Sequence, residues 1–229
     1  MRKLGLIGGV SWVSTAMYYE QINKGVARAA GGLTSAPLLL ESLDFAAVAD
    51  LQSAGEWGRL AALMCDTARR LEGAGAEGLI LCSNTLHKVH DEVAAAVSVP
   101  ILHIGDVTAD KLVADGCKRS GLIGTRFTMG ESFYRERLEE KGIAVTIPDP
   151  ATAQEIDRII FEELAKGQVL RQSERRLKTC LTEMGKARQQ AVILGCTELV
   201  MLVDPGANVL PVYDTTALHA KAAVEWILG

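Results

Sequence analysis

The sequence predicts an α/β fold with two pseudo-symmetric lobes, each a mostly parallel sheet flanked by helices. Short, almost continuously apolar runs alternate with longer amphipathic segments, which is typical of parallel strands covered by helices on both faces. Two of these runs also recur at a fixed offset. The run GLIGG at positions 5–9 returns 116 positions later (121 − 5) as GLIGT at 121–125. A chain of 229 residues can form one large domain or two small ones.

Eight apolar runs are expected to form strands. Each is short, rich in Val, Ile and Leu, and followed by glycine or polar residues, as expected for strands buried in a parallel sheet. In chain order they are 3–7, 37–42, 78–82, 101–104, 120–123, 144–147, 191–194 and 210–212.

Eight amphipathic segments are expected to form helices between and after these strands. Gly31 with Gly32, and Gly167, follow two of them and should end them as glycine C-caps. The helices are expected at 14–30, 56–73, 86–95, 107–115, 131–141, 154–165, 170–189 and 216–228. Because the last strand and helix can return to the first lobe, we expect lobes of 1–108 plus 209–229, and of 109–208.

Composition excludes several classes of protein. The net charge of −4, without a basic stripe, argues against a nucleic-acid partner. No run approaches the about 20 apolar residues needed to span a bilayer, and glycines break the apolar run at 4–13, which superficially resembles a signal peptide. Five cysteines, an odd number without C-x-x-C spacing, indicate reduced thiols rather than disulfides or zinc ligands. We therefore expect a cytoplasmic protein.

Ser83 and Cys196 are the most informative pair of residues. Each follows a similar predicted strand and precedes a similar predicted helix, 113 positions apart (196 − 83). Two matching lobes that each offer a polar group at a strand end could hold a small carbon acid in one cleft. An acid on one face and a base on the other is the geometry of racemisation. A helix N-terminus would lower the pKa of the Cys196 thiol, although a buried cysteine is more often a small apolar residue.

Other polar positions allow both a structural and a functional interpretation. The turn at 5–11 has Ile7 where a dinucleotide-binding G-x-G-x-x-G needs glycine, so its backbone N–H groups either hold a carboxylate or only form a tight turn. The polar side chains of Ser83, Asn84 and Thr85, which follow the third predicted strand, can cap a helix or bind substrate. His87 and His90 could share a helix face, but no third metal ligand is evident, and His219 is expected to be structural.

At these positions the chain resembles the aspartate/glutamate racemase family, which works without pyridoxal phosphate. The resemblance covers essentially the whole length and is closest to the bacterial L-aspartate/glutamate-specific and broad-specificity amino acid racemases. The motifs that carry it are GGVSW at 8–12 with Ser14 and Thr15, NTLH at 84–87, GTRFTM at 124–129, GCTE at 195–198 and PVYDT at 211–215.

The chain departs from the family pattern at three positions. The family usually has a cysteine before its first Asn-Thr, where this chain has Ser83. Cys82 lies one residue earlier and should point away from the cleft, because neighbouring side chains of a strand alternate in direction. Val10 and Val13 replace a commoner methionine and glutamate. A hydroxyl in place of the first cysteine also occurs in the L-aspartate/glutamate-specific subgroup, so activity need not be lost.

The resemblance implies two Rossmann-like lobes with the active site between them, in a homodimer. It also implies cofactor-independent racemisation of aspartate or glutamate, with Cys196 as base for the L enantiomer and Ser83 as the opposing acid. No metal is implied. The expected substrate-binding residues are Gly9, Val10, Asn84, Thr85, Thr125, Arg126, Thr197 and Glu198. Two alternatives stay open: another enzyme of the superfamily, such as a malonate-type decarboxylase with a single cysteine, or a non-enzymatic amino-acid-binding protein.

Overall fold

The computed structural model describes residues 1–204 and 206–229, and it divides into two compact units. The first unit comprises Met1–Ile104 and His219–Gly229, and the second comprises Gly105–Leu218. Each unit contains a four-stranded sheet in which all pairs are parallel, so the predicted α/β class is confirmed. The lobe limits expected from the sequence stay a prediction, because spatial compactness does not show which segments fold independently.

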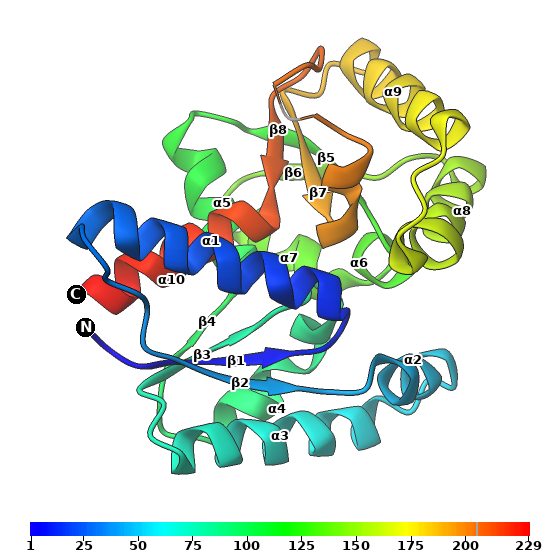
Figure 1. The fold of residues 1–229 in the computed structure, drawn as a ribbon. Helices are drawn as coiled ribbons and strands as arrows, with labels where there is room; N and C mark the ends of the chain where they lie inside the picture. Colours follow the sequence, from blue (N-terminus) through cyan, green and yellow to red (C-terminus); the bar gives the residue numbers. More distant parts are fainter. Residues whose placement is uncertain (205) are drawn as a thin grey trace. The chain divides into compact units, whose positions relative to one another are not determined.

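The sheet of the first unit has the strand order β2-β1-β3-β4 (Figure 1). Its strands are β1 (Leu4–Gly8), β2 (Leu38–Ser42), β3 (Gly78–Leu81) and β4 (Ile101–Leu102). The helical elements of this unit are α1 (Trp12–Ala30), α2 (Phe45–Ser53), α3 (Trp57–Gly73), the 3₁₀ helix η1 (Thr85–Val89), α4 (His90–Ala95) and most of α10 (Thr215–Leu228).

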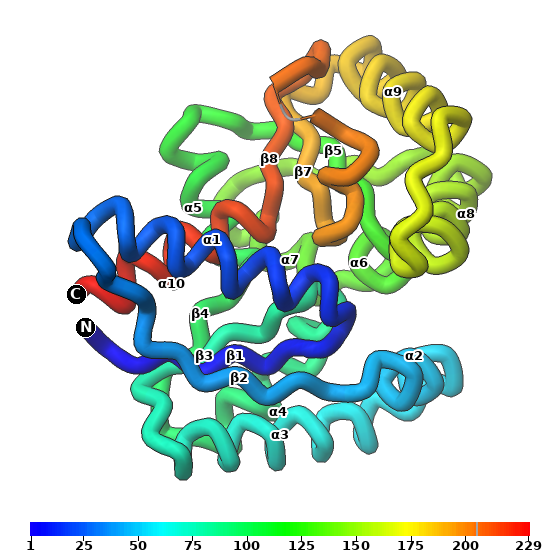
Figure 2. Tube along the Cα trace, in the orientation of Figure 1, coloured from blue at the N-terminus to red at the C-terminus, as the bar shows by residue number. Residues whose placement is uncertain are grey.

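Alternating side chains of β1 and β3 fill two separate cores in the first unit. Ile7 and Leu81 pack with residues of α3 and α4 on one face, and Leu6 and Ile80 pack with residues of α1 and α10 on the other. Figure 2 shows the C-terminal helix lying beside α1, so the two ends of the chain cover the same face. Burying each such side chain contributes about 1.5–3 kcal/mol, which explains the continuously apolar strands.

The sheet of the second unit repeats this order as β6-β5-β7-β8. Its strands are β5 (Arg119–Gly124), β6 (Ala144–Thr146), β7 (Ala191–Gly195) and β8 (Val212–Asp214). Its helical elements are α5 (Ile104–Ala114), α6 (Arg126–Gly130), α7 (Ser132–Glu140), α8 (Pro150–Arg158), the π-helical η2 (Ile159–Glu163), the 3₁₀ helices η3 (Leu164–Lys166) and η4 (Thr197–Met201), and α9 (Arg171–Lys186). Strand β5 therefore corresponds to β1 and β7 to β3, as the repeated sequence predicts.

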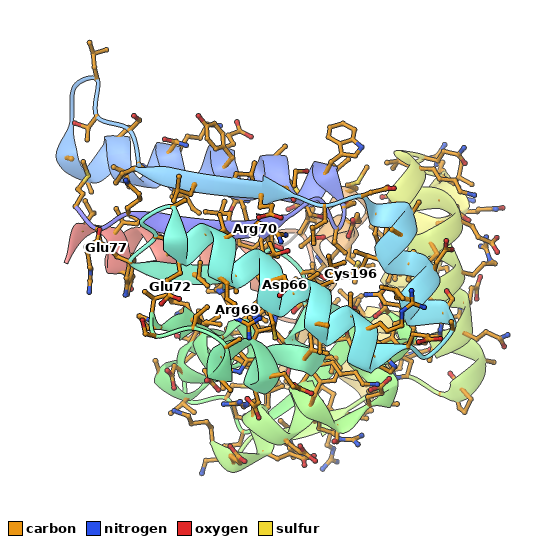
Figure 3. All side chains as sticks on the ribbon, turned by 90° about the horizontal axis from the view of Figure 1, so that it is seen from below. Asp66, Arg69, Arg70, Glu72, Glu77 and Cys196 are labelled. Carbon is orange, nitrogen blue, oxygen red and sulfur yellow. The ribbon has the colours of Figure 1, made fainter. Side chains whose placement is uncertain are left out.

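Surface ion pairs fix the outer side of α3 (Figure 3). Asp66 and Arg69 pair one turn apart at 3.0 Å, and Arg70 pairs with Glu41 of β2. Glu72 accepts a hydrogen bond of 2.8 Å from the backbone N–H of Ser98, just before β4. Exposed pairs of this kind contribute at most about 1 kcal/mol each, so they orient the helix rather than hold the unit together.

Among the described residues, no helix is long and apolar enough to cross a membrane.

Several element boundaries differ from the sequence-based expectation. The fourth predicted strand ends at Leu102, and Ile104 begins a helix instead. The predicted helix at 86–95 is a 3₁₀ turn followed by α4, and the one at 154–165 continues α8 through π and 3₁₀ turns. The short helices α2 and α6 were not expected, and the helix expected after Cys196 is the 3₁₀ helix η4. Gly31 and Gly167 do end helices, with φ of 75° and 73°.

Candidate functional site

The predicted site residues lie at equivalent strand ends in the two units. In the first unit Gly9 follows β1 and Ser83 follows β3, and these strands are neighbours. In the second unit Thr125 follows β5 and Cys196 follows β7, where Gly124 pairs with Gly195. The carboxyl ends of parallel strands are where open α/β sheets bind ligands. Each unit therefore carries its candidate residues at the edge of its sheet suited to bind a ligand.

A buried thiol and a buried carboxylate meet at the end of β7. Cys196, labelled in Figure 3, is 7% exposed, and its Sγ donates a hydrogen bond of 3.0 Å to Oε2 of Glu198. The Thr197 hydroxyl donates to the same oxygen at 2.6 Å. Two donors converge on one carboxylate oxygen, so Glu198 is the hydrogen-bond acceptor of the Cys196 thiol.

The resting state of Cys196 differs from the sequence-based expectation. Burial first, and then the charge of Glu198, raise the pKa of the Cys196 thiol well above its usual range. The predicted lowering by a helix N-terminus is wrong, because the element that follows is a five-residue 3₁₀ turn with little dipole, and because a carboxylate accompanies the thiol. Both effects favour the protonated thiol of Cys196 over its thiolate.

Ser83 stands where Cys196 stands in the other unit. It is half-buried and follows β3, and its carbonyl oxygen lies 2.8 Å from Nδ1 of His87. Asn84 and Thr85 are buried beside it. Cys82 packs into the core between the sheet and helices α1 and α10, where burial strongly raises the pKa of its thiol. The expected alternation is thus confirmed for Cys82, whose thiol is an inert core group.

The glycine turn after β1 is tightly held by its own neighbours. Gly9 has φ of 86°, and a Cβ atom there would lie 2.1 Å from the carbonyl oxygen of Leu43. Its N–H already donates a 2.8 Å hydrogen bond to Oγ1 of Thr15, so a carboxylate would have to compete with that hydroxyl. The side chain of Val10 is buried with Val48 in the core. The structure therefore gives this turn a packing role and leaves its substrate contacts a prediction.

Thr125 and Arg126 begin helix α6. The Thr125 hydroxyl accepts a hydrogen bond of 3.3 Å from the backbone N–H of Thr128 and so caps the helix. Asp157 of α8 accepts the backbone N–H of Arg126 at 2.7 Å and its guanidinium at 3.0 Å. A cavity of about 550 Å³ borders this pair together with Phe161. A substrate carboxylate at Arg126 would therefore have to share the guanidinium with Asp157.

All four histidines of the chain gather in the first unit. The ring of His87 lies 4.6 Å from that of His103, 5.8 Å from His219 and 6.2 Å from His90. The sequence spacing indicated only that His87 and His90 share a face. Within the described chain, no group of three or more His, Cys, Asp or Glu side chains is arranged to hold a metal ion. The imidazoles of His87 and His219 bind backbone and tyrosine groups, and that of His90 binds the Asp91 carboxylate.

Comparison with known proteins gives consistent matches along the whole chain. The family described as Asp/Glu/hydantoin racemase matches residues 7–223. The broad-specificity amino-acid racemase RacX of Bacillus subtilis (strain 168) is 27% identical over 164 residues, which is 72% of this chain and 70% of that protein. A structure from Yersinia pestis assigned to the Asp/Glu racemases is 43% identical with a TM-score of 0.94, and an aspartate racemase homologue from Pyrococcus horikoshii OT3 is 33% identical with a TM-score of 0.85. Both comparisons cover 100% of each chain.

Proposed function

Because this chain belongs to the Asp/Glu/hydantoin racemase family, we propose that it racemises an acidic amino acid, aspartate or glutamate, without a cofactor. The observation that carries the proposal is the Cys196–Glu198 pair at the end of β7, with Ser83 at the equivalent end of β3. A thiol with a proton acceptor and a hydroxyl at matched positions are the two groups that inversion at Cα requires.

The proposed reaction begins with a proton transfer from the Cys196 thiol to Glu198. The thiolate then takes the Cα proton of the L substrate, so that the Cα–H bond breaks and an S–H bond forms. The electron pair left on Cα delocalises into the substrate carboxylate, whose charge hydrogen-bond donors such as Asn84 and Thr125 would stabilise. Ser83 gives its hydroxyl proton to the opposite face of Cα. The proton that Glu198 took then returns through water to the Ser83 alkoxide, so that Glu198 is again a carboxylate and the cycle closes.

The two directions of the reaction are expected to differ in rate. A serine hydroxyl is a poor base without a helper, whereas the Cys196 thiolate is a good one once Glu198 holds its proton. kcat and KM should therefore differ between the L and D substrates. The equilibrium constant stays one, because the free enantiomers have equal energies.

Arg126 supports the choice of an acidic substrate only in part. Its guanidinium could bind a side-chain carboxylate, but Asp157 already neutralises it at 3.0 Å. RacX is named as a broad-specificity enzyme, so neutral amino acids belong in the substrate test beside aspartate and glutamate. We propose aspartate or glutamate as the first substrates to examine. We also propose that the protein is a cytoplasmic homodimer; light scattering of the purified protein would test the number of subunits.

The test compares two buried cysteines that differ in their neighbours. Cys196→Ala should lower the rate of deuterium entry into Cα of L-aspartate by several orders of magnitude, since it removes the proposed base for that proton. Cys82→Ala should change it little, because that thiol packs in the core without a carboxylate partner. Proton NMR in deuterium oxide, with chiral chromatography of the product, measures both. Equal losses in the two variants would overturn the assignment of Cys196.

A one-thiol site also fits a decarboxylase that protonates a carbanion from one face only. The observation that favours this alternative is Ser83 in place of a second cysteine. Carbon dioxide release from a disubstituted malonate, without exchange at Cα of amino acids, would support it. Tight binding of an amino acid without any exchange would instead indicate a binding protein.

A further inference from the structure

A buried histidine joins Ser83 to a second strand end of the same sheet. The ring of His87, in η1, is 2% exposed. Its Nδ1 lies 2.8 Å from the carbonyl oxygen of Ser83, and its Nε2 lies 3.2 Å from the backbone N of Ile104 at the start of α5. We propose that His87 is a positioning residue that fixes Ser83 for proton transfer at Cα. This inference rests on the proposed racemase function.

The two contacts determine the tautomer of His87. The carbonyl oxygen of Ser83 can only accept a hydrogen bond, so Nδ1 of His87 carries a proton and donates it. The backbone N–H of Ile104 can only donate, so Nε2 is unprotonated and accepts. Only the neutral imidazole satisfies both partners. Burial, together with the neighbouring imidazoles of His103 and His219, holds the pKa of His87 well below its usual range, which keeps the ring in this form.

The carbonyl of Ser83 is open to the imidazole because the turn after it is a 3₁₀ helix. In an α-helix this carbonyl would accept the backbone N–H of His87, four residues later. Here that N–H pairs with Asn84 at 3.1 Å, as in a 3₁₀ turn. The His87 side chain replaces the missing backbone hydrogen bond. The position of the Ser83 backbone therefore depends on a side chain that other elements hold in place.

The neighbouring histidines explain why His87 has little freedom. His219 from α10 packs its ring 5.8 Å from that of His87. Its Nε2 lies 2.9 Å from the carbonyl oxygen of Leu102, and its Nδ1 lies 2.9 Å from the hydroxyl of Tyr18. The ring of His103 packs against that of His87 on a further side, at 4.6 Å. The imidazole of His87 is thus packed between two other rings, of which that of His219 is itself held by hydrogen bonds to Tyr18 and Leu102.

Such support matters most for a weak acid–base group. Ser83 has to present its hydroxyl to one face of Cα, and displacements of about 1 Å can cost two orders of magnitude in rate. Cys196 lies in the other unit and owes its position to Glu198 and Thr197. Loosening Ser83 should therefore impair inversion while leaving proton removal by Cys196 in place.

Replacing His87 with asparagine or with glutamine, two amides of similar size, tests its two hydrogen bonds one at a time. In His87→Asn the amide nitrogen can occupy the place of Nδ1, so the contact with Ser83 can persist and the one with Ile104 is lost. In His87→Gln the amide oxygen can occupy the place of Nε2, so the contact with Ile104 can persist and the one with Ser83 is lost. Both variants leave a small cavity and an amide in a buried site, so losses of packing are matched. Tyr18→Phe, which removes the hydroxyl partner of His219 and leaves both hydrogen-bond partners of His87 in place, is the control.

The readout is the ratio of two rates measured with L-aspartate in deuterium oxide. One is deuterium entry into Cα of the L substrate, and the other is formation of D-aspartate. We expect His87→Gln to lower D-aspartate formation at least tenfold more than deuterium entry, and His87→Asn and Tyr18→Phe to leave the ratio near that of the wild type. Equal ratios in all three variants, or a larger change in His87→Asn, would overturn the role of His87. Wild-type protein that neither exchanges nor inverts any amino acid would instead reject the proposed function.

Discussion

At the scale of single residues, the carboxylate of Glu198 decides how reactive Cys196 can be. Replacing it in Glu198→Gln removes the acceptor of the thiol proton and should lower deprotonation of the L substrate about 10²–10⁴-fold at neutral pH. Removing the negative charge also lowers the pKa of Cys196, because Glu198 is one of the groups that raise it. The variant should therefore regain activity as the pH rises and the thiol ionises directly.

The pH dependence of kcat for L-aspartate measures this effect. Glu174→Gln, an exposed carboxylate of α9 that pairs with Lys178, is the control and should keep the wild-type profile. A Glu198→Gln variant whose activity is equally low at every pH would contradict the role of proton acceptor.

The same residues show what a sequence can say about a site. The repeated strand pattern correctly predicted that Ser83 and Cys196 follow equivalent strands. The sequence did not predict the ionisation of Cys196, because burial and the orientation of Glu198 depend on packing that no local pattern specifies. It also could not reveal that His103 and His219 join His87, since these positions meet only when β3, β4 and α10 come together.

At the scale of elements, the turn between β1 and α1 depends on a glycine at position 9. Gly9→Ala would combine a left-handed φ of 86° with a Cβ atom 2.1 Å from the backbone of Leu43. We expect a loss of about 1–2 kcal/mol of unfolding free energy from the backbone conformation and about 1–3 kcal/mol more from the overlap. Gly32→Ala also needs a positive φ, but nothing lies within 4 Å, so only the first loss should occur. Urea denaturation measures both, and equal losses would show that the contact with Leu43 relaxes freely.

Strands that form continuous apolar runs were predicted well, and short helices were not. Strands β1, β3, β5 and β7 lie within one or two residues of the expected ranges, because burial on both faces leaves a continuous apolar run. Helices α2 and α6 are nine and five residues long and begin at side-chain caps, Asp44 and Thr125, whose signal is too local to separate from a turn. The 3₁₀ turn that exposes the Ser83 carbonyl likewise leaves no periodic pattern.

At the scale of the whole molecule, acid should destabilise the two units unequally. All four histidines lie in the first unit, and burial lowers the pKa of His219 to about 4 and that of His87 well below its usual range. Between pH 6.5 and 4 the unfolded chain binds protons at these rings and the folded unit does not, so stability falls as the pH is lowered. His219 alone accounts for about 3 kcal/mol over this window.

Hydrogen exchange followed by mass spectrometry at pH 7 and pH 4.5, corrected for intrinsic exchange rates, measures this difference by segment. Peptides from β1, β3 and α1 should lose more protection on acidification than peptides from β5, β7 and α9. His219→Asn removes one titrating ring and should lower stability at pH 7 while flattening its dependence on pH. Equal losses in both units would mean that carboxylates rather than histidines govern acid stability. Protonation of His87 in acid would then cost little free energy, contrary to the hydrogen bond from the Ile104 N–H, which a protonated Nε2 cannot accept.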